Sequence, residues 1–365
     1  MSMAQARRPW RILLLPGDGI GPEVMAAARP VMEVSSWELQ SRSGRPLEVV
    51  TSVIGGAALD TLGTPLPAET VRRAQVADAV LLGAVGGPAW DGRPPDERPE
   101  AGLLALRRAL RVYANLRPAW TLPRAPAFAE QPPGAEAFDV LLVRELTGGL
   151  YYGRPRERRQ TPDGRRSAVD TMAYSEEEIR RVAHVAFRAA RERRRRVTSV
   201  DKANVLACSR LWREVVDEVG REYPDVRLDH QLVDSAAMGL VTRPGAYDVI
   251  LTENLFGDIL SDMVGGLAGQ FGALASASLG DGGPGLFEPV HGSAPDLAGR
   301  DTATPAGAIL SFALLCRYAL GAAALATAIR EAVEQVMREQ PHLGTMAFGE
   351  AAARQLRARC QMALT

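Results

Sequence analysis

Short apolar runs that alternate with amphipathic segments constrain the fold of this chain more than any other feature. The runs predict buried strands at residues 11–15, 47–53, 77–83, 138–145, 196–201, 226–233 and 247–251. The segments between and after them predict helices at residues 22–39, 67–75, 100–113, 175–195, 208–220, 256–267 and 305–337. Strands that alternate with helices are typical of an α/β fold.

Residues that typically begin or end helices support several of these boundaries. Pro22 is expected at the first position of its helix. Ser175 and Glu178 have the spacing of a capping box, which predicts a helix start there. The segment 121–137 is rich in proline and alanine, so we expect it to cross between two domains. The chain shows no internal repeat that would indicate a solenoid.

The composition excludes several classes of protein. The 43 basic and 43 acidic side chains cancel, which argues against a dedicated nucleic-acid binder. No apolar run reaches the roughly 18 residues of a transmembrane helix, and the run at residues 12–15 is too short for a signal peptide. Cys208, Cys316 and Cys360 lie far apart without a CxxC pair, so we expect no disulfide scaffold and a cytoplasmic location.

Only one of the basic residues, Lys202, is a lysine. Arginine cannot give up its proton at physiological pH, whereas a lysine can be tuned to do so. Nucleotide-composition bias also explains a high share of arginine. The lone lysine is therefore a candidate general base, and coincidence is the alternative.

The glycine-rich stretch LPGDGIGP at residues 15–22 lies between a predicted strand and a predicted helix. Its spacing is GxGxG, not the GxGxxG of a dinucleotide fingerprint, and it lacks the Lys-Ser/Thr of a phosphate-binding loop. Two interpretations remain. Its amides approach a ligand, or the stretch is only a tight connection between strand and helix.

Asp258 and Asp262 are four residues apart, so both project from one face of a predicted helix. Oxygen-only ligands suit Mg²⁺ or Mn²⁺. A solvated acidic face is the alternative. The apolar residues around this pair indicate a half-buried segment, which favours a ligand site.

Arg107, Arg117 and Arg144 occur in contexts that favour binding of carboxylates. Arg117 follows a predicted helix, and Arg144 lies at the end of the predicted strand 138–145. A guanidinium group suits a two-point grip on a carboxylate. A structural salt bridge is the alternative for each, and Glu145 is a neighbour able to form one.

The arginine-rich segment 191–196 suggests nucleic-acid binding at first sight. It lies at the end of a predicted helix, where cations complement the helix dipole. We therefore predict a solvated helix end.

Taken together, the motifs resemble the isocitrate/isopropylmalate family of β-decarboxylating dehydrogenases, most closely the members that act on 3-isopropylmalate. The resemblance runs over nearly the whole chain, from residue 14 into the helix after Pro305. Its blocks, in chain order, are LLPGDGIGPEV, LLGAVGGPAWDG, RPEAGLLALR, YANLRPA, VRELTGGLYYG, VDKANVL, NLFGDILSD and FEPVHGSAPDLAG. Several blocks in this order are far more specific than any one of them.

The resemblance implies a two-domain fold of the isocitrate/isopropylmalate dehydrogenase type, which is α/β but not a Rossmann fold. Residues 1–113 and 268–365, from both ends of the chain, are expected to form a cofactor-binding domain. Residues 114–267 are expected to form a central domain with the dimer interface and the metal and catalytic residues. A homodimer with shared active sites is implied.

The implied activity is NAD-dependent oxidative decarboxylation of 3-isopropylmalate to 4-methyl-2-oxopentanoate in leucine biosynthesis, through a metal-chelated 2-oxo intermediate. Mg²⁺ or Mn²⁺ is expected to bind the substrate, a 2-hydroxy dicarboxylate with an apolar side chain, and to act as a Lewis acid. The same chemistry on another 3-substituted malate, on tartrate or on malate is the alternative.

The resemblance also implies roles for single residues. Asp258 and Asp262 match metal ligands, and Asp234 matches a third ligand from the partner subunit. Lys202, also donated by the partner, matches the residue that takes the hydroxyl proton, and nearby cations would favour its neutral form. Tyr151 matches the acid that protonates the enol after CO₂ leaves. The residues implied to contact the substrate are Arg107, Arg117, Arg144, Asp234, Glu100, Leu103, Leu104, Asn204 and Val205.

Leu103 and Leu104 bear on the choice of substrate. Family members specific for isocitrate have small polar residues on this helix, whereas two leucines offer an apolar wall for a branched alkyl group. Adjacent residues lie about 100° apart on a helix, so one leucine can face the core and the other a pocket.

For NAD, the resemblance implies binding by segment 87–100 and loop 292–304. His291 is expected against the adenine, and no second His or Cys lies at the spacing of a metal site. Asp296 is expected to bind the adenosine ribose, which disfavours NADP. Thr304 stands where the family usually has asparagine, so weaker cofactor binding is expected. The implied cofactor residues are Gly87, Glu100, His291, Gly292, Ser293, Ala294, Asp296 and Thr304.

Two other classes remain as alternatives at this point. A nucleotide hydrolase built on residues 17–21 lacks the lysine that such a loop needs. A non-catalytic, arginine-rich assembly protein is the other, and dehydrogenase activity would exclude it.

Overall fold

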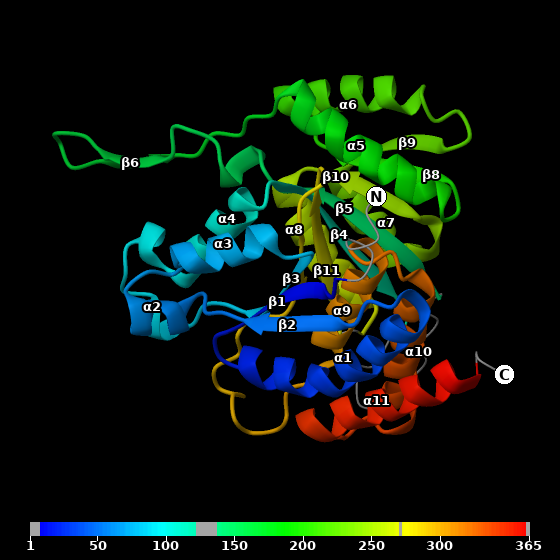
Figure 1. The fold of residues 1–365 in the computed structure, drawn as a ribbon. Coiled ribbons are helices and arrows are strands. Elements are labelled where there is room, and N and C mark those ends of the chain that lie inside the picture. The colour runs from blue at the N-terminus through cyan, green and yellow to red at the C-terminus, as the bar shows by residue number, and fades with distance from the viewer. Residues whose placement is uncertain (1–7, 122–136, 270–271, 363–365) are drawn as a thin grey trace. The chain divides into compact units, whose positions relative to one another are not determined.

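The computed structural model describes residues 8–121, 137–269 and 272–362, and the chain divides into two compact units (Figure 1). Of the described residues, unit 1 contains 8–112, 269 and 272–362, and unit 2 contains 113–121 and 137–268. Except for its end residues, the predicted crossing segment 121–137 lies outside the described residues.

The sheet of unit 1 is built from both ends of the chain. Its strands are β1 (Trp10–Gly17), β2 (Leu47–Thr51), β3 (Ala79–Ala84), β11 (Ala275–Gly280) and β12 (Gly285–Pro289). They lie in the order β2-β1-β3-β12-β11, and all neighbours are parallel except β11 and β12. Leu13 and Leu15 alternate along β1 with Ile12 and Leu14, and all four are buried. One strand thus supplies apolar side chains to both faces of the sheet.

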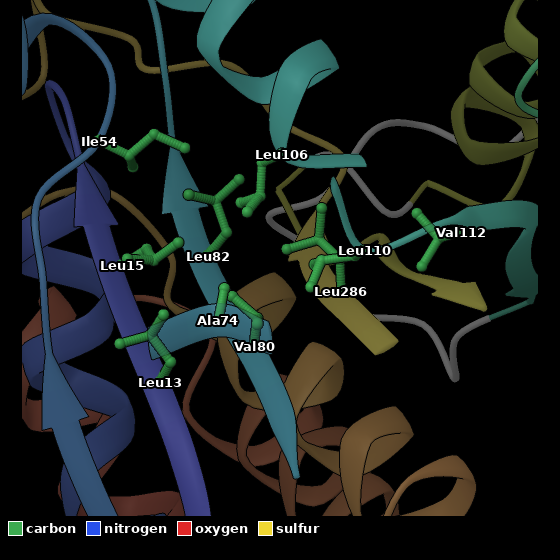
Figure 2. Packing of buried hydrophobic residues seen from close by; sticks show 10 residues of the cluster. All are labelled: Leu13, Leu15, Ile54, Ala74, Val80, Leu82, Leu106, Leu110, Val112 and Leu286. Atoms are coloured by element: carbon green, nitrogen blue, oxygen red, sulfur yellow. The ribbon is translucent and has the colours of Figure 1, made fainter. Parts of the chain in front are cut away.

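Helices cover both faces of this sheet (Figure 1). They are α1 (Gly21–Ser43), α2 (Gly56–Leu62), α3 (Ala68–Val76), α4 (Pro99–Ala109), α9 (Ala306–Tyr318), α10 (Ala323–Glu339) and α11 (Thr345–Met362). Figure 2 shows the core on one face, where Ala74 of α3 and Leu106 of α4 pack with Leu13 and Leu82. Helices α1 and α9 contact β3, and α1 packs along α11.

The strands of unit 2 are β4 (Val112–Trp120), β5 (Asp139–Glu145), β8 (Arg196–Asp201), β9 (Arg227–Leu232) and β10 (Val249–Thr252). Their order is β4-β5-β10-β8-β9, with β4 antiparallel to β5 and the other pairs parallel. The helices are α5 (Glu176–Arg191), α6 (Ala207–Gly220), α7 (Val233–Thr242) and α8 (Asn254–Leu267). Because β5, β10, β8 and β9 run in one direction, the segments that follow them start at one edge of the sheet.

Shorter elements complete the two units. The hairpin of β6 (Glu157–Gln160) and β7 (Arg166–Val169) forms a separate antiparallel pair, and residues 154–168 are all exposed. Single 3₁₀ turns are η2 (Pro88–Trp90), η3 (Pro95–Glu97), η4 (Gly149–Tyr151) and η5 (Pro244–Ala246). No helix in the described part of the chain is long and apolar enough to cross a membrane.

The capping box predicted at Ser175 is confirmed. The backbone N–H of Glu178 donates to Ser175 Oγ at 3.3 Å, and that of Ser175 donates to Glu178 Oε2 at 2.8 Å. Two orphan N–H groups at the start of α5 are thereby satisfied.

The predicted helix at residues 100–113 is wrong at its end, because α4 stops at Ala109. Arg111 has a φ of 55°, a left-handed conformation that a helix cannot continue, and β4 begins at Val112. Arg117 therefore lies within a strand. The predicted helix 305–337 is two helices, α9 and α10, separated around Gly321 with a φ of 65°.

The arginine-rich segment 191–196 is less solvated than predicted. The Arg193 guanidinium, 23% exposed, forms ion pairs with the buried Asp248 at 2.9 Å and with Asp139 at 2.7 Å. Arg194 also lies 3.6 Å from Asp248. These arginines bind acids at the amino ends of β5 and β10, so part of the segment is structural.

Candidate active site

Two carboxylates lie on one side of α8, the helix that follows β10. Asp258 and Asp262 are one turn apart, and their side chains are 34% and 68% exposed. Glu253 caps the helix by accepting hydrogen bonds from two backbone N–H groups of its first turn at 2.6 and 3.0 Å. The cap and the strand before it fix where the carboxylates point.

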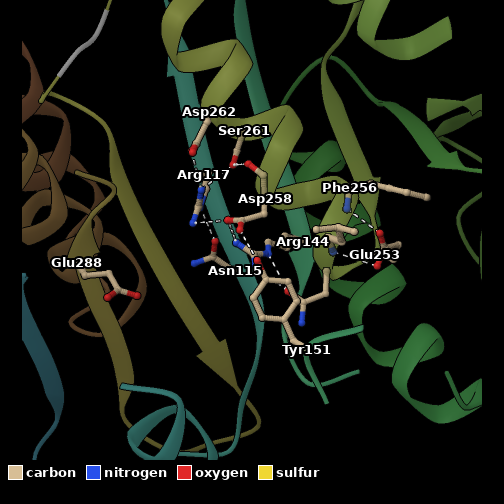
Figure 3. A network of polar contacts seen from close by, with 12 residues as sticks. Asn115, Arg117, Arg144, Tyr151, Glu253, Phe256, Asp258, Ser261, Asp262 and Glu288 are labelled. Carbon is tan, nitrogen blue, oxygen red and sulfur yellow. Dashed lines mark hydrogen bonds and ion pairs between the residues drawn. The ribbon is translucent and has the colours of Figure 1, made fainter. Parts of the chain in front are cut away.

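Arg144, at the end of β5, reaches the first of these carboxylates (Figure 3). Its guanidinium is paired with Asp258, and it donates to the amide oxygen of Asn254 from Nε at 3.0 Å and from Nη2 at 2.8 Å. Only 3% of Arg144 is exposed. Gly257 makes room for it, since a Cβ there would lie 2.7 Å from Arg144 Cγ.

Arg117 reaches the same helix from the neighbouring strand β4. It donates to Ser261 Oγ at 2.6 Å and to Asp262 Oδ1 at 3.2 Å, and lies 3.5 Å from Asp258. Asn115, two residues earlier on the same face of the strand, accepts from Arg117 Nε at 2.9 Å. The antiparallel register places Asn115 opposite Arg144, which brings both guanidinium groups to α8.

Tyr151 completes this cluster from the turn η4. Its hydroxyl donates to Asp258 Oδ2 at 2.5 Å. Burial, followed by the hydrogen bond to Asp258, raises the pKa of Tyr151 above its usual value, so the phenol keeps its proton. Burial opposes ionisation of Asp258, but the charge of Arg144 and the hydrogen bond from Tyr151 outweigh it and lower the pKa of that carboxyl.

The donor set of α8 fits a divalent cation that prefers oxygen. Asp258 and Asp262 offer carboxylate oxygens only, which suit Mg²⁺ or Mn²⁺. Within the described residues, no three of the His, Cys, Asp and Glu side chains group closely enough to hold a metal ion. One chain therefore brings together two of the three predicted acids, and Asp234 does not join them.

Asp234 instead lies beside Lys202. Lys202 follows β8, Asp234 is in the first turn of α7 after β9, and these parallel strands are neighbours. The lysine Nζ donates to Asp234 Oδ1 at 2.6 Å, which lowers the pKa of the exposed carboxyl. Asn204 and Val205, in the turn after Lys202, are both exposed.

Arg107, on α4 of unit 1, forms an ion pair with Glu288 of β12, with Nη2 2.7 Å from Oε1. The two side chains are 15% and 9% exposed. The structural salt bridge that was the alternative for this arginine is therefore present. Glu288 lies in the block FEPVHGSAPDLAG, but no role was predicted for it from the sequence.

The two adjacent leucines of α4 have different surroundings. Leu103 packs against the buried cluster of unit 1 that includes Leu82 and Leu106. Leu104 is also half-buried but is not part of this packing. Glu100, one turn earlier, places Oε1 so close to Gly86 that a Cβ there would lie 2.4 Å away. Gly86 and Gly87 have φ values of 105° and 153°.

His291 has a buried Nε2 atom without a hydrogen-bond partner among the residues that the structure describes. Its Nδ1 lies 2.9 Å from the carbonyl oxygen of Gly292, and burial lowers its pKa, so the ring is neutral. A donor on Nδ1 leaves Nε2 as an unused acceptor. An amine such as the one on adenine fits that acceptor.

The loop after His291 has one buried anchor. Ser293 is 7% exposed, and Ala294 has a φ of 36°. Asp296 is exposed, whereas the hydroxyl of Thr304 accepts from the backbone N–H of Ala306 at 3.3 Å at the start of α9. Thr304 thus helps to cap a helix.

Several residues of the cluster had no assigned role in the sequence. Asn254 and Ser261 lie in blocks that were recognised, but only the strand register shows that they bind the arginines. Glu253 and Glu288 are similar cases. A polar residue beside a motif residue is the sole signal that sequence offers for such partners.

Comparison with known proteins agrees with this architecture. The family model "Isocitrate/isopropylmalate dehydrogenase" matches residues 11–359. The chain is 53% identical to 3-isopropylmalate dehydrogenase of Nitratidesulfovibrio vulgaris, over 90% of this chain and 91% of that protein. It is 49% identical to 3-isopropylmalate dehydrogenase of Methylococcus capsulatus, over 95% and 99%.

Among solved structures, isocitrate dehydrogenase from Methylococcus capsulatus superimposes with a TM-score of 0.82 at 34% identity, covering 95% of this chain and 99% of that one. A β-decarboxylating dehydrogenase from Thermococcus kodakarensis gives a TM-score of 0.75 at 34% identity, with 97% of both chains covered.

The fold and the comparisons together identify the protein as a decarboxylating dehydrogenase. The chain belongs to the isocitrate/isopropylmalate dehydrogenase family. Both the family resemblance and the α/β fold predicted from the sequence are confirmed.

Replacing Arg144 with lysine tests how much the cluster depends on the guanidinium fork. Lysine keeps the charge, but its single nitrogen cannot reproduce the contacts that Nε and Nη2 make with Asn254 and Nη1 makes with Asp258. We expect the free energy of unfolding to fall by about 2–4 kcal/mol, because buried acceptors lose charged hydrogen bonds. Denaturant unfolding measures this, with Arg188→Lys on the exposed face of α5 as control. Equal midpoints for the two variants would contradict the role of the fork.

Proposed function

We propose that the protein catalyses NAD-dependent oxidative decarboxylation of 3-isopropylmalate to 4-methyl-2-oxopentanoate, a step of leucine biosynthesis. The observation that carries the proposal is the cluster of Arg117, Arg144, Tyr151, Asp258 and Asp262. Relatives that share about half of their residues with the chain are named for this substrate, at 49–54% identity. The solved isocitrate dehydrogenase shares 34%.

When bound, NAD accepts a hydride and Mg²⁺ or Mn²⁺ polarises the substrate oxygens. The chain's own groups supply binding and proton transfer. Arg117 and Arg144 bind substrate carboxylates through two-point hydrogen bonds, and Arg107 is assigned the same role. Lys202 takes the proton of the C2 hydroxyl, and Tyr151, whose raised pKa keeps the phenol protonated until that step, donates its proton to the carbon that has lost CO₂.

The cofactor is assigned to the expected cofactor-binding domain of residues 1–113 and 268–365, of which Tyr113 and Ala268 belong to unit 2 and the other described residues to unit 1. His291 Nε2, the buried acceptor, supports a contact with the adenine amine. The remaining positions are those of segment 87–100 and loop 292–304, with Asp296 disfavouring NADP. Thr304, whose hydroxyl accepts a helix N–H, replaces an asparagine of the family, and weaker adenine binding follows.

A homodimer with shared active sites is part of the proposal. Asp234 and Lys202 do not join the acids of α8 within one chain, which supports their supply from a second copy. Met238 and Val241 of α7 and Ile259 of α8 are large apolar side chains that are 58–67% exposed, and a partner would cover them. A cytoplasmic location fits the three free cysteines.

The activity is tested by mixing the protein with NAD, Mn²⁺ and a panel of 2-hydroxy dicarboxylates, and following NADH. We expect turnover of 3-isopropylmalate, little with isocitrate, and loss of activity with EDTA that Mn²⁺ restores. NADP should support much slower turnover. Faster reaction with another 3-substituted malate, tartrate or malate would replace the proposed substrate, and no NADH with any would contradict the activity.

Lys202→Arg keeps the positive charge beside Asp234 and removes the ability to exchange a proton at neutral pH. We expect kcat to fall by at least about 10²-fold, with the KM for NAD nearly unchanged. Steady-state kinetics measure both. Arg188→Lys is again the control, and a near-normal kcat for Lys202→Arg would show that the lone lysine is a coincidence of composition.

The different surroundings of Leu103 and Leu104 predict different defects. Leu104→Ala should lower kcat/KM for 3-isopropylmalate by roughly tenfold, because an apolar contact with the alkyl group is lost, and change the melting temperature little. Leu103→Ala should lower the free energy of unfolding by about 2 kcal/mol instead. Kinetics and thermal unfolding of the pair separate the two effects. The reverse pattern would exchange their assignments.

A further inference from the structure

The glycine-rich turn at residues 17–21 directs its amides at the protein. The backbone N–H of Asp18 donates to the carbonyl oxygen of Ala84 at 2.7 Å, and that of Ile20 donates to the carbonyl oxygen of Ser293 at 2.8 Å. Gly19 has a φ of 57°, and a Cβ there would lie 2.0 Å from the same Ser293 oxygen. The turn is therefore hydrogen-bonded to the end of β3 and to loop 292–304. The amides of Asp18 and Ile20 are not available to a phosphate.

The side chain of Asp18 holds a further part of unit 1. It is 4% exposed. Oδ2 accepts hydrogen bonds from the backbone N–H groups of Gly56 and Gly86, and Oδ1 accepts from that of Ala57, each at 2.8 Å. One buried carboxylate thus ties the start of α2 to the loop after β3.

The loops that converge on this turn are those to which the proposed function assigns the cofactor. Gly86 leads directly into segment 87–100, and its unusual φ is held in place by the bond to Asp18. Ser293 belongs to loop 292–304. No cofactor role was assigned to Asp18 itself, and at 4% exposure its polar atoms face backbone.

We propose that Asp18 is a positioning residue for NAD: it sets the backbone at Gly86 and Gly87 so that segment 87–100 can bind the half of the cofactor beyond the adenosine. The backbone N–H of Ile20, in the same turn, binds the carbonyl oxygen of Ser293 and so positions loop 292–304. This contact does not involve the side chain of Asp18. The inference rests on the proposed function, and it predicts a selective defect in cofactor binding.

The substitution Asp18→Asn tests this because asparagine has nearly the same shape as aspartate but only one acceptor atom. A carboxylate can accept from all three N–H groups at once. The NH₂ group of the asparagine would face either the backbone N–H of Ala57 or the backbone N–H groups of Gly56 and Gly86. In either orientation, at least one buried backbone N–H would lose its acceptor.

The experiment compares the wild-type enzyme with Asp18→Asn by titration with NADH and with AMP, and by kinetics with 3-isopropylmalate and Mn²⁺. We expect the dissociation constant for NADH and the KM for NAD to rise about tenfold or more. AMP affinity, kcat and the KM for 3-isopropylmalate should stay within about twofold of wild type. Glu38→Gln, a buried carboxylate of α1 that is 2% exposed, is the matched control and should leave all of these constants unchanged.

Unchanged NADH affinity in a folded Asp18→Asn variant would overturn the inference. A parallel loss of NADH, AMP and substrate affinity would also overturn it, since it would indicate general damage. Wild-type enzyme that binds neither NADH nor AMP would contradict the proposed function itself, which keeps the two failures distinct.

If Asp18→Asn does not fold, Gly86→Ala applies the same test from the other partner. At a φ of 105° an alanine is strained, and its Cβ would also displace the Glu100 carboxylate, so the backbone at Gly86 is disturbed while Asp18 stays intact. We expect weaker NADH binding with AMP binding retained. Wild-type affinity for NADH in Gly86→Ala would refute the positioning role.

Discussion

The buried guanidinium of Arg144 is the interaction on which the cluster of unit 2 depends. It joins the end of β5 to the first two turns of α8 through Asn254 and Asp258. Burial alone would favour a neutral Asp258, and Arg144, the hydrogen bond from Tyr151 and the charge of Arg117 together reverse that preference. Because Gly257 lacks a side chain, the arginine passes close to the helix. The ion pair with Arg144 thus helps to set both the position and the charge of the acid.

Buried carboxylates that bind backbone N–H groups recur where strands end. Glu145 accepts from the N–H groups of Thr147 and Gly148, and Glu253 caps α8 in the same way. Burial raises the pKa of both acids, so these hydrogen bonds work against a desolvation penalty. In unit 1, Asp18 likewise accepts hydrogen bonds from backbone N–H groups just after the end of β1. Each carboxylate holds a turn that carries or adjoins candidate site residues.

The sequence predicted most strands and helices because short apolar runs and caps such as Ser175 are local signals. Prediction from the sequence failed where an element or a contact depends on residues that are distant along the chain. β11 and β12 contain serine, glycine and proline without a clear alternation, and neighbouring strands define them. Motif residues such as Asp258 were found, whereas Asn115 and Asn254 were not. Their roles arise from the register of β4 against β5 and the start of α8, which no spacing along the chain encodes.

The charges of the cluster balance one another, and the same balance suits the proposed chemistry. Arg117 and Arg144 neutralise Asp258 and Asp262, two positive groups against two negative groups. In the proposed function, a divalent cation and a dicarboxylate would bring charges of +2 and −2, so their joint binding would leave the balance unchanged. The acids can then bind the cation while the arginines bind the carboxylates, and each group exchanges one ionic partner for another. Either ligand alone would leave like charges unpaired in a half-buried site, which opposes its binding. Arginine suits this exchange because its fork binds a substrate carboxylate with the geometry that it uses for aspartate.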